Sequence, residues 1–242
     1  MRVFLEFVAL VAENRTFSWL RPIGLAFAAA HSFRASSNEI RSLTVVVRLR
    51  YSAGAAMAIE ISRKLFTVHD YHRMVDAGIL CEDDRVELIR GEVLTMSPIG
   101  PRHSAAVLRA TQSLVRIVGD LAIVGVQGSI RLDEYDEPQP DIYLLRPKDD
   151  FYASGHAGPA DIFLIVEMAD SSLEYDREIK MGLYAETGVP EYWIADIRND
   201  CVIAYSNPDK LSYRTTQTFQ RGSILNPHLL PECPIPVDVL LP

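Results

Sequence analysis

The sequence predicts an α+β fold in which helices flank a mixed sheet. From residue 64 onward, the expected elements follow the order helix, hairpin, helix, several strands, helix and further strands. Two of the strands, at 139–145 and 162–167, are strongly β-like runs. The 242 residues are sufficient for one well-buried domain with an appendage, or for two small domains.

Three segments carry the signals of helices. Thr67 is a suitable N-cap for a helix at 68–75, which ends before a glycine. Apolar residues recur at helical spacing through 103–118. A third helix is expected at 176–187, because the Gly-Val-Pro sequence that follows would stop it.

Strands account for most of the remaining elements. Residues 84–89 and 92–96 alternate in polarity around an Arg-Gly pair, which is typical of a β-hairpin. A loop at 146–160 separates the two central runs. Further strands are expected at 121–126, 128–133, 191–196, 201–206 and 211–217.

The first 56 residues differ in composition from the rest of the chain. They contain seven arginines, no lysine and three acidic residues. Their apolar stretches are interrupted by charges and fall short of the roughly 18 to 20 residues that span a bilayer. An organellar targeting peptide would have a similar composition. We interpret 1–56 as a poorly structured N-terminal extension upstream of Met57, the expected natural start, and 57–242 as one domain.

The cysteines and histidines show no metal-ligand spacing. Cys81, Cys201 and Cys233 are odd in number and widely separated, which predicts neither a disulfide framework nor a zinc site. A reducing, cytoplasmic compartment is therefore expected. The six histidines form no ligand pattern either, and His69 and His72 are interpreted as helix-surface or capping residues.

The net charge of −8 is distributed unevenly. Residues 1–56 carry +4, and the remainder carries −12. An acidic domain does not attract nucleic acid over its whole surface. A phosphodiester substrate would therefore require a local basic rim or a bound metal ion.

Two acidic residues stand at opposite ends of the two β-like runs. If these strands pair antiparallel, Asp141 at the start of one lies beside Glu167 at the end of the other. Neighbouring carboxylates repel unless a cation or a shared proton lies between them, and oxygen ligands suit Mg²⁺ or Mn²⁺. The alternative is that Asp141 caps a turn after Pro140 and Glu167 is a solvated strand end.

Lys180 lies in the third predicted helix, beyond Glu167. Asp176, Lys180 and Tyr184 recur every four residues and therefore share one helix face. An ion pair between Asp176 and Lys180 on a solvated face is the simpler interpretation. Near the carboxylates, the lysine would instead stabilise charge developing on a metal-bound phosphate or orient the attacking water.

Several motifs in combination resemble one family. They are RVELIRGEVLTMSP with Glu87, QPDIYLL with Asp141, and LIVEMADSSLEYDREIKMGLYAETGVPEYWIAD with Glu167 and Lys180. Over about 64–240 the chain resembles the Uma2 (Uma-two) family of restriction endonucleases, in the PD-(D/E)XK nuclease superfamily. The resemblance implies a restriction-endonuclease-like fold.

The resemblance also implies a Mg²⁺-dependent nuclease site. Asp141 and Glu167 would be its metal ligands. Lys180 would be the catalytic lysine and Glu87 a further acidic member. The expected neighbours of the site are His103, Asp170 and Tyr184. The simpler alternatives are a strand-end acid for Glu87 and a polar residue of the helix N-terminus for His103.

The chain departs from the family pattern in two respects. Many relatives have serine and threonine where this chain has Asp170 and Leu173. Asp170 would either bind metal or cap the following helix. The lysine does not stand two residues after Glu167, where Ala169 is found, so activity requires Lys180 to reach back from the helix.

These inferences predict a metal-dependent endonuclease that hydrolyses phosphodiester bonds, with DNA as the expected substrate and Mg²⁺ or Mn²⁺ as the cofactor. A homodimer is expected if both strands are cut, and no membrane association is expected. One alternative is a non-catalytic binding or assembly module of the same fold, which the acidic surface favours. The other is a two-carboxylate glycosidase, which the lysine and the proline–aspartate strand disfavour.

Overall fold

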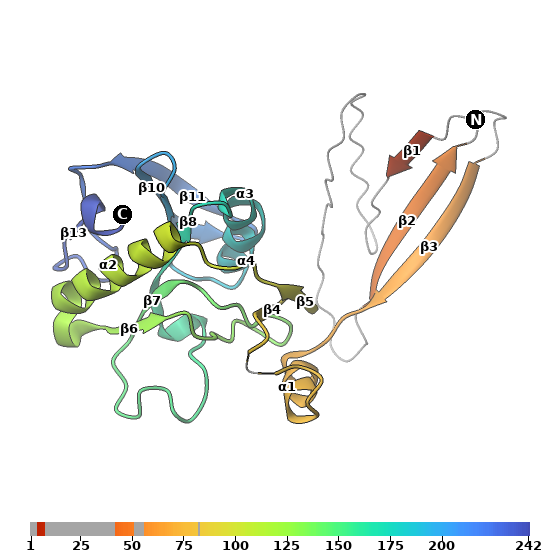
Figure 1. The fold of residues 1–242 in the computed structure, drawn as a ribbon, viewed down its shortest axis with the longest axis horizontal. Helices are drawn as coiled ribbons and strands as arrows, with labels where there is room; N and C mark the ends of the chain where they lie inside the picture. Colours follow the sequence, from red (N-terminus) through yellow and green to blue (C-terminus); the bar gives the residue numbers. More distant parts are fainter. Residues whose placement is uncertain (1–3, 8–41, 51–55, 82) are drawn as a thin grey trace. The chain divides into compact units, whose positions relative to one another are not determined.

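The computed structural model describes residues 4–7, 42–50, 56–81 and 83–242 (Figure 1). The chain divides into two compact units, Met1–Phe66 and Thr67–Pro242. This boundary lies after the predicted domain start at Met57. Most of the predicted extension lies outside the described residues, so its status stays a prediction.

The first unit contains a three-stranded antiparallel sheet. Its strands are β1 (Phe4–Phe7), β2 (Ser42–Arg50) and β3 (Ala56–Lys64), in that spatial order. β3 spans Met57, so a chain that starts there would retain β3 without its partner β2.

The second unit is built on a six-stranded mixed sheet (Figure 1). Its strands lie in the order β11 (Ser212–Gln220), β10 (Cys201–Asp209), β9 (Glu191–Asp196), β8 (Ile162–Ala169), β7 (Ile142–Leu145) and β6 (Ile123–Val126). β8 and β9 are parallel, and the other neighbouring pairs are antiparallel. The predicted α+β class with a mixed sheet is therefore confirmed.

Helices and short strands complete the second unit. The helices are α1 (Val68–Asp76), α2 (Pro101–Val118), α3 (Leu173–Tyr175) and α4 (Met181–Glu186), with a π-helical turn at Asp176–Lys180 between the last two. Single 3₁₀ turns lie at Gly119–Leu121, Pro159–Asp161 and Val237–Val239. The short strands are β4 (Val86–Ile89), β5 (Glu92–Thr95), β12 (Ile224–Leu225) and β13 (Ile235–Pro236), paired as two hairpins. Within the described residues, no helix is long and apolar enough to cross a membrane.

The predicted cap of the first helix is present. The Thr67 hydroxyl accepts a hydrogen bond from the Asp70 N–H, and the Asp70 carboxylate accepts one from the Thr67 N–H. This reciprocal arrangement satisfies backbone donors that an α-helix leaves unpaired at its N-terminus.

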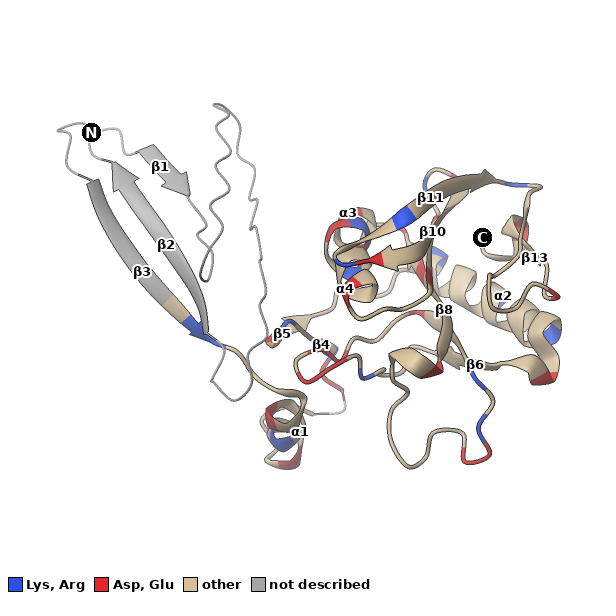
Figure 2. Cartoon of the chain, turned by 180° about the vertical axis from the view of Figure 1, so that it is seen from behind, with Lys and Arg blue, Asp and Glu red and all other residues tan. Residues whose placement is uncertain are grey.

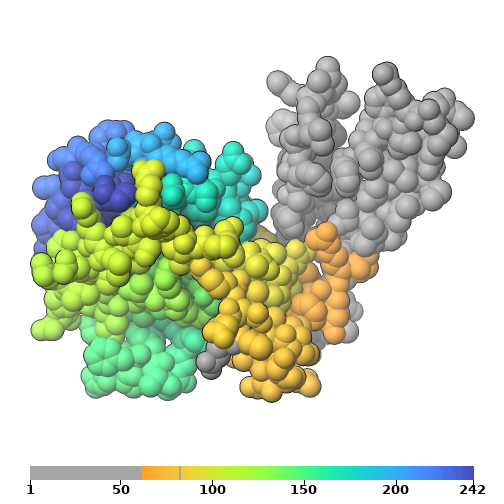
Figure 3. Space-filling view, in the orientation of Figure 1, coloured from red at the N-terminus to blue at the C-terminus, as the bar shows by residue number. Residues whose placement is uncertain are grey.

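Apolar side chains cover both faces of the sheet. On one face, Val166 and Trp193 pack with α2 and with the C-terminal segment 230–241. Figure 3 shows α2 and this blue segment side by side. On the other face, Ile165 and Tyr192 pack with α4. Because successive side chains of a strand point to opposite faces, the residue after Val166 in β8 belongs to the α4 side.

The predicted strand at 128–133 is not formed. Its Ile130 N–H bonds to the Pro138 carbonyl over 3.0 Å, and its Leu132 N–H bonds to the Asp136 carbonyl over 3.0 Å. The segment therefore closes a local loop instead of extending the sheet. Ile130 and Leu132 are buried, so the alternation that suggested a strand reflects packing of an irregular segment.

Candidate active site

The ends of β7 and β8 bring Asp141 beside Glu167, as the antiparallel pairing predicts. Ile142 pairs with Val166 in the register of the two strands. The Asp141 N–H donates a hydrogen bond to Glu167 Oε2 (3.1 Å), and the Met168 N–H donates one to Asp141 Oδ2 (2.9 Å). These reciprocal bonds hold both carboxylates at one end of the sheet.

Glu167 is buried, so its interpretation as a solvated strand end is wrong. Its Oε1 accepts hydrogen bonds from Lys180 Nζ (2.8 Å) and from the Tyr184 hydroxyl (3.1 Å). Both donors come from the helical segment that covers this face of the sheet. Lys180 therefore reaches back to Glu167, as the family resemblance requires.

Asp176 and Lys180 are also buried. The interpretation of these two residues as an ion pair on a solvated face is therefore wrong. Asp176 Oδ2 accepts a hydrogen bond from the Ser172 hydroxyl (2.6 Å), and its backbone carbonyl accepts one from the Tyr192 hydroxyl (3.3 Å). These contacts anchor the π-helical turn, at whose two ends Asp176 and Lys180 lie.

Glu87 joins the same centre from β4. Its Oε2 lies 3.6 Å from Lys180 Nζ and accepts a hydrogen bond from the Gln139 N–H (3.3 Å). Its Oε1 accepts a hydrogen bond from the Tyr175 hydroxyl (3.0 Å). Glu87 is buried within β4, so its side chain lies inside the protein and not on a solvated edge of the hairpin.

His103 approaches Asp141 from the first turn of α2. Its Nε2 lies 2.9 Å from Asp141 Oδ1, to which Gln127 Nε2 also donates a hydrogen bond (3.3 Å). Asp141 and His103 are the more accessible members, with side chains 14% and 17% exposed. This is the side from which a ligand can enter.

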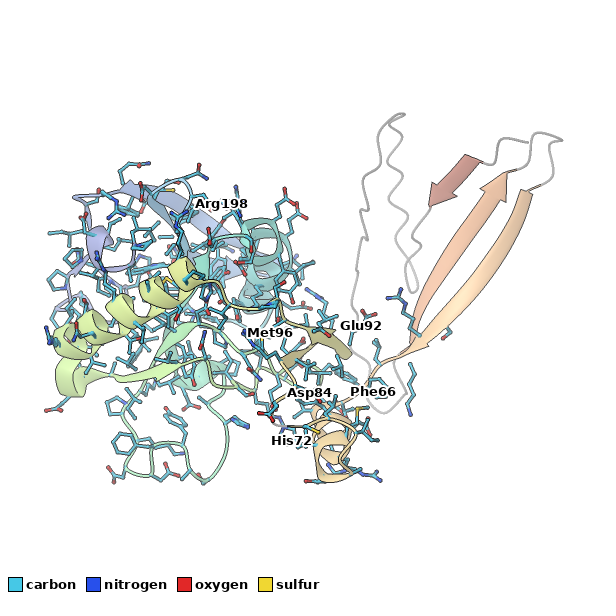
Figure 4. All side chains as sticks on the ribbon, in the orientation of Figure 1. Phe66, His72, Asp84, Glu92, Met96 and Arg198 are labelled. Atoms are coloured by element: carbon cyan, nitrogen blue, oxygen red, sulfur yellow. The ribbon has the colours of Figure 1, made fainter. Side chains whose placement is uncertain are left out.

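Asp170 is not brought to this centre. Its Oδ1 lies 3.5 Å from Arg198 Nε, and Arg198 is an exposed residue labelled in Figure 4. Ser172, not Asp170, stands at the N-cap of α3. Both roles considered for Asp170, a metal ligand and a helix cap, therefore lack support in the geometry.

The electrostatics of the centre are dominated by burial and by an excess of acids. Burial raises the pKa of Glu167 well above its ordinary value, Lys180 opposes this rise, and Asp141 and Asp176 add to it. Burial alone would lower the pKa of Lys180, but the surrounding carboxylates of Glu167, Glu87 and Asp176 outweigh it and raise that pKa. Burial likewise raises the pKa of Asp176 to about 6.

Asp141 and His103, the more accessible members, have pKa shifts that arise from their mutual hydrogen bond. Burial opposes ionisation of Asp141, but the hydrogen bond from His103 and its charge hold the pKa of that carboxyl below its usual value. The same hydrogen bond raises the pKa of His103. Asp141 therefore stays ionised, and the protonated form of His103 beside it is favoured.

The residues present fit a hard divalent cation. Four buried or partly buried acids, Glu87, Asp141, Glu167 and Asp176, surround the single lysine. Glu167 Oε2 and Asp141 Oδ2 each accept a backbone N–H bond. Because a carboxylate oxygen has two acceptor positions, Glu167 Oε2 and Asp141 Oδ2 each keep one position for a cation. Oxygen donors with excess negative charge suit Mg²⁺ or Mn²⁺.

Sequence reasoning missed several supporting residues. Tyr175 and Gln139 hold Glu87, Gln127 holds Asp141, and Ser172 holds Asp176. Tyr175 and Ser172 flank the predicted helix face, so their proximity in the chain was an available signal. Gln127 lies in a loop and carries no such signal. Gln139 lies in the QPDIYLL motif, but it holds Glu87 through its backbone N–H, which a side-chain pattern does not identify.

Comparison with known proteins identifies the family and the fold. The Uma2 family model, described as "Putative restriction endonuclease", matches residues 68–238. A "putative nuclease belonging to DUF820" from Anabaena variabilis ATCC 29413, known from a crystal structure, is 15% identical in sequence to this chain, and the two structures align with a TM-score of 0.56. The match covers 72% of this chain and 97% of that chain, and shows a shared fold. No curated protein matches. Because the Uma2 family model covers more than half of this chain, the chain belongs to the Uma2 family.

Proposed function

We propose that this protein is a metal-dependent endonuclease that hydrolyses phosphodiester bonds in DNA. The proposal rests on one observation above all. Asp141 and Glu167 come from adjacent strands, and Lys180 reaches Glu167 from the neighbouring helix. Family membership supports the reaction class.

In this proposal, Asp141 and Glu167 hold Mg²⁺ or Mn²⁺. The ion, when bound, lowers the pKa of a water molecule and polarises the phosphoryl oxygen. His103 orients Asp141 through their 2.9 Å contact. Tyr184 and Lys180 fix Glu167 Oε1, which directs Oε2 toward Asp141.

Lys180 has a second proposed role as a source of positive charge. The attacked phosphate gains negative charge in the transition state, and a cation fixed beforehand stabilises that charge without reorganisation. Glu87 holds Lys180 from the opposite side through the 3.6 Å ion pair. Glu87 is therefore proposed as a positioning residue.

A groove beside the centre offers a path for the substrate. It has a volume of about 680 Å³ and is lined by residues of α2 and β6, with Gln127 at one border. Gln127 also contacts Asp141, and Arg109 in the lining offers a phosphate partner. Acidic and basic residues are interspersed over the second unit (Figure 2), so binding depends on such local cations.

The assembly and the cellular location belong to the same proposal. A homodimer would place two centres on the two strands of a duplex. Cys81, Cys201 and Cys233 are free thiols, which suits the reducing cytoplasm.

A non-catalytic binding or assembly module is the second candidate. One observation favours it: every carboxylate oxygen of Asp141 and Glu167 already accepts a hydrogen bond within the protein. Such a network satisfies itself and does not require an ion.

Calorimetric titration of Mg²⁺, which does not suit imidazole ligands, separates the two candidates. We expect binding to the unaltered protein and to Asp170→Ala, whose acid lies outside the centre, and loss of binding in Asp141→Ala. The unaltered protein and Asp170→Ala should nick supercoiled plasmid DNA, and Asp141→Ala should not. Equal metal affinity of Asp141→Ala and Asp170→Ala, or no affinity in any of the proteins, would favour the binding module.

A further inference from the structure

Three side chains outside the acidic centre converge in space from distant parts of the chain. They are His72 of α1, Glu137 of the segment that pairs with β4, and His156 of the loop between β7 and β8. One ligand atom from each lies within 4.8 Å of the others. Sequence spacing predicts no histidine ligand set, because 65 residues separate His72 from Glu137.

The contacts within this cluster are specific. Both carboxylate oxygens of Glu137 face His72 Nε2, at 2.8 and 3.0 Å. The rings of His72 and His156 meet edge to face, with centroids 6.0 Å apart. Glu137 is buried, whereas the side chain of His72, labelled in Figure 4, is 47% exposed. A buried carboxylate is thus directed at imidazole groups that solvent can reach.

We propose that His72, Glu137 and His156 bind a zinc-class divalent cation at a site separate from the acidic centre. Two imidazoles and one carboxylate are a ligand set of protein-bound zinc that leaves one position for water. Imidazole nitrogen does not suit Mg²⁺, which selects oxygen ligands. Tetrahedral bonds of about 2.0–2.2 Å place ligand atoms ~3.3 Å apart, which requires only small side-chain movements from the present arrangement.

The ion would connect three segments that support the acidic centre. The backbone of Glu137 pairs with Leu88, the neighbour of Glu87, through N–H···O bonds of 2.8 and 3.3 Å. Gln139, two residues beyond Glu137, donates its N–H to Glu87. α1 is held to the same region by the Val68 N–H, which bonds to the Glu134 carbonyl over 2.8 Å. Bound metal would therefore stabilise the folded state in which Glu87 is positioned.

The test uses the full chain carrying Asp141→Asn, which removes the proposed Mg²⁺ ligand and leaves this cluster intact. After treatment with a chelator, the protein is titrated with Co²⁺, followed by its visible absorption, and with Zn²⁺, followed by thermal unfolding. The same titrations are made with His156→Ala added. The matched control adds His69→Ala, which removes an exposed histidine of the same helix.

We expect one Co²⁺ per chain and a Zn²⁺-dependent rise in Tm in the Asp141→Asn protein and in the His69→Ala control. His156→Ala keeps the His72–Glu137 contact, so it should fold, but its affinity for Co²⁺ should fall at least about tenfold. Mg²⁺ at the same concentration should leave Tm unchanged. Equal Co²⁺ affinity in His156→Ala and His69→Ala, or no binding at all, would overturn the proposal. Because Asp141 is absent throughout, failure here is independent of the nuclease proposal.

Discussion

Lys180 and Glu167 form an ion pair inside the protein, with Nζ and Oε1 2.8 Å apart and side chains only 7% and 4% exposed. The sequence alone allowed Glu167 to be a solvated strand end and Lys180 to lie on a solvated helix face. Burial excludes both interpretations, and removing the lysine would leave the buried Glu167 carboxylate without water or a counterion. The lysine therefore contributes to folding as well as to the proposed chemistry.

The first prediction concerns the stability of Lys180→Ala. We expect its free energy of unfolding to fall by about 3–5 kcal/mol, the usual cost of breaking a buried pair. The double variant with Glu167→Gln should lose less than the sum of the two single variants, since the uncompensated charge is removed. Urea denaturation of the unaltered protein, the two single variants and the double variant measures these free energies of unfolding. Strict additivity would show that the two side chains do not interact.

The second prediction concerns activity. Asp141→Asn should reduce divalent-dependent DNA cleavage to background while folding normally, because the asparagine carbonyl oxygen can still accept the Met168 N–H bond. Lys180→Ala, assayed well below its Tm, should retain Mn²⁺ binding and cleave on the order of 10²–10³ more slowly. Asp170→Asn serves as the control and should cleave at the unaltered rate. Cleavage by Asp141→Asn at that rate would place the activity elsewhere.

The third prediction concerns pH and Asp136. Burial, with a smaller contribution from Asp133, raises the pKa of Asp136 to about 7. The folded protein then holds this proton more tightly than the unfolded chain. The stability from this group is complete below about pH 4 and is lost as pH rises to about 7, with a slope of up to about 1.4 kcal/mol per pH unit.

Asp136→Asn should remove this dependence, since asparagine can accept the same hydrogen bond from the Arg90 N–H. Unfolding free energies at pH 5 and pH 7.5 should therefore differ less in Asp136→Asn than in the unaltered protein. An identical pH difference in both proteins would show that Asp136 titrates normally.

The fourth prediction tests the close approach of β6 to β7. A methyl group added at Gly125 would overlap the ring of Tyr143 on the paired strand. Gly125→Ala should therefore destabilise the protein by about 1–3 kcal/mol, the usual cost of overpacking. Gly155→Ala is the matched control, because its added methyl group would meet no neighbour within 4 Å and the residue lies in a loop. Equal Tm values for the two variants would contradict the strand register.

The fifth prediction concerns the N-terminal residues. A chain that starts at Met57 should unfold cooperatively at nearly the same temperature as the full chain, because the second unit has its own hydrophobic clusters. Differential scanning calorimetry of the two chains measures this. Loss of the cooperative transition would show that residues before Met57 are part of the domain.

The central strand pair could be predicted because its signals are local. The apolar runs that became β7 and β8 and the loop between them were sufficient to place Asp141 beside Glu167. The four-residue spacing was sufficient to place Lys180 and Tyr184 on one face. Burial of this face was not predictable, because it depends on β4, whose Glu87 meets Lys180 from almost a hundred positions earlier in the chain.

Other features depend on contacts that no local pattern encodes. The segment at 128–133 alternates like a strand, but none of the described strands pairs with it. Its Ile130 and Leu132 N–H groups bond to Pro138 and Asp136, and its Arg131 N–H bonds to Ala157. The convergence of His72 with His156 requires α1 and a long loop to meet. Periodicity reports which side chains are buried, not which segments meet.

The π-helical turn gives the chain one place beside the acidic centre where its length can change by one residue. Such a turn accommodates one more residue than a regular α-helical turn. Its exposed residues Arg177 and Glu178 would each appear dispensable, since neither contributes to the core. The Met181 N–H bonds to the Asp176 carbonyl across this turn, and removing Arg177 or Glu178 would convert that bond to the regular α-helical spacing. Tyr184 would therefore keep its direction toward Glu167, whereas a one-residue deletion in α4 between Met181 and Tyr184 would rotate Tyr184 away by about 100°.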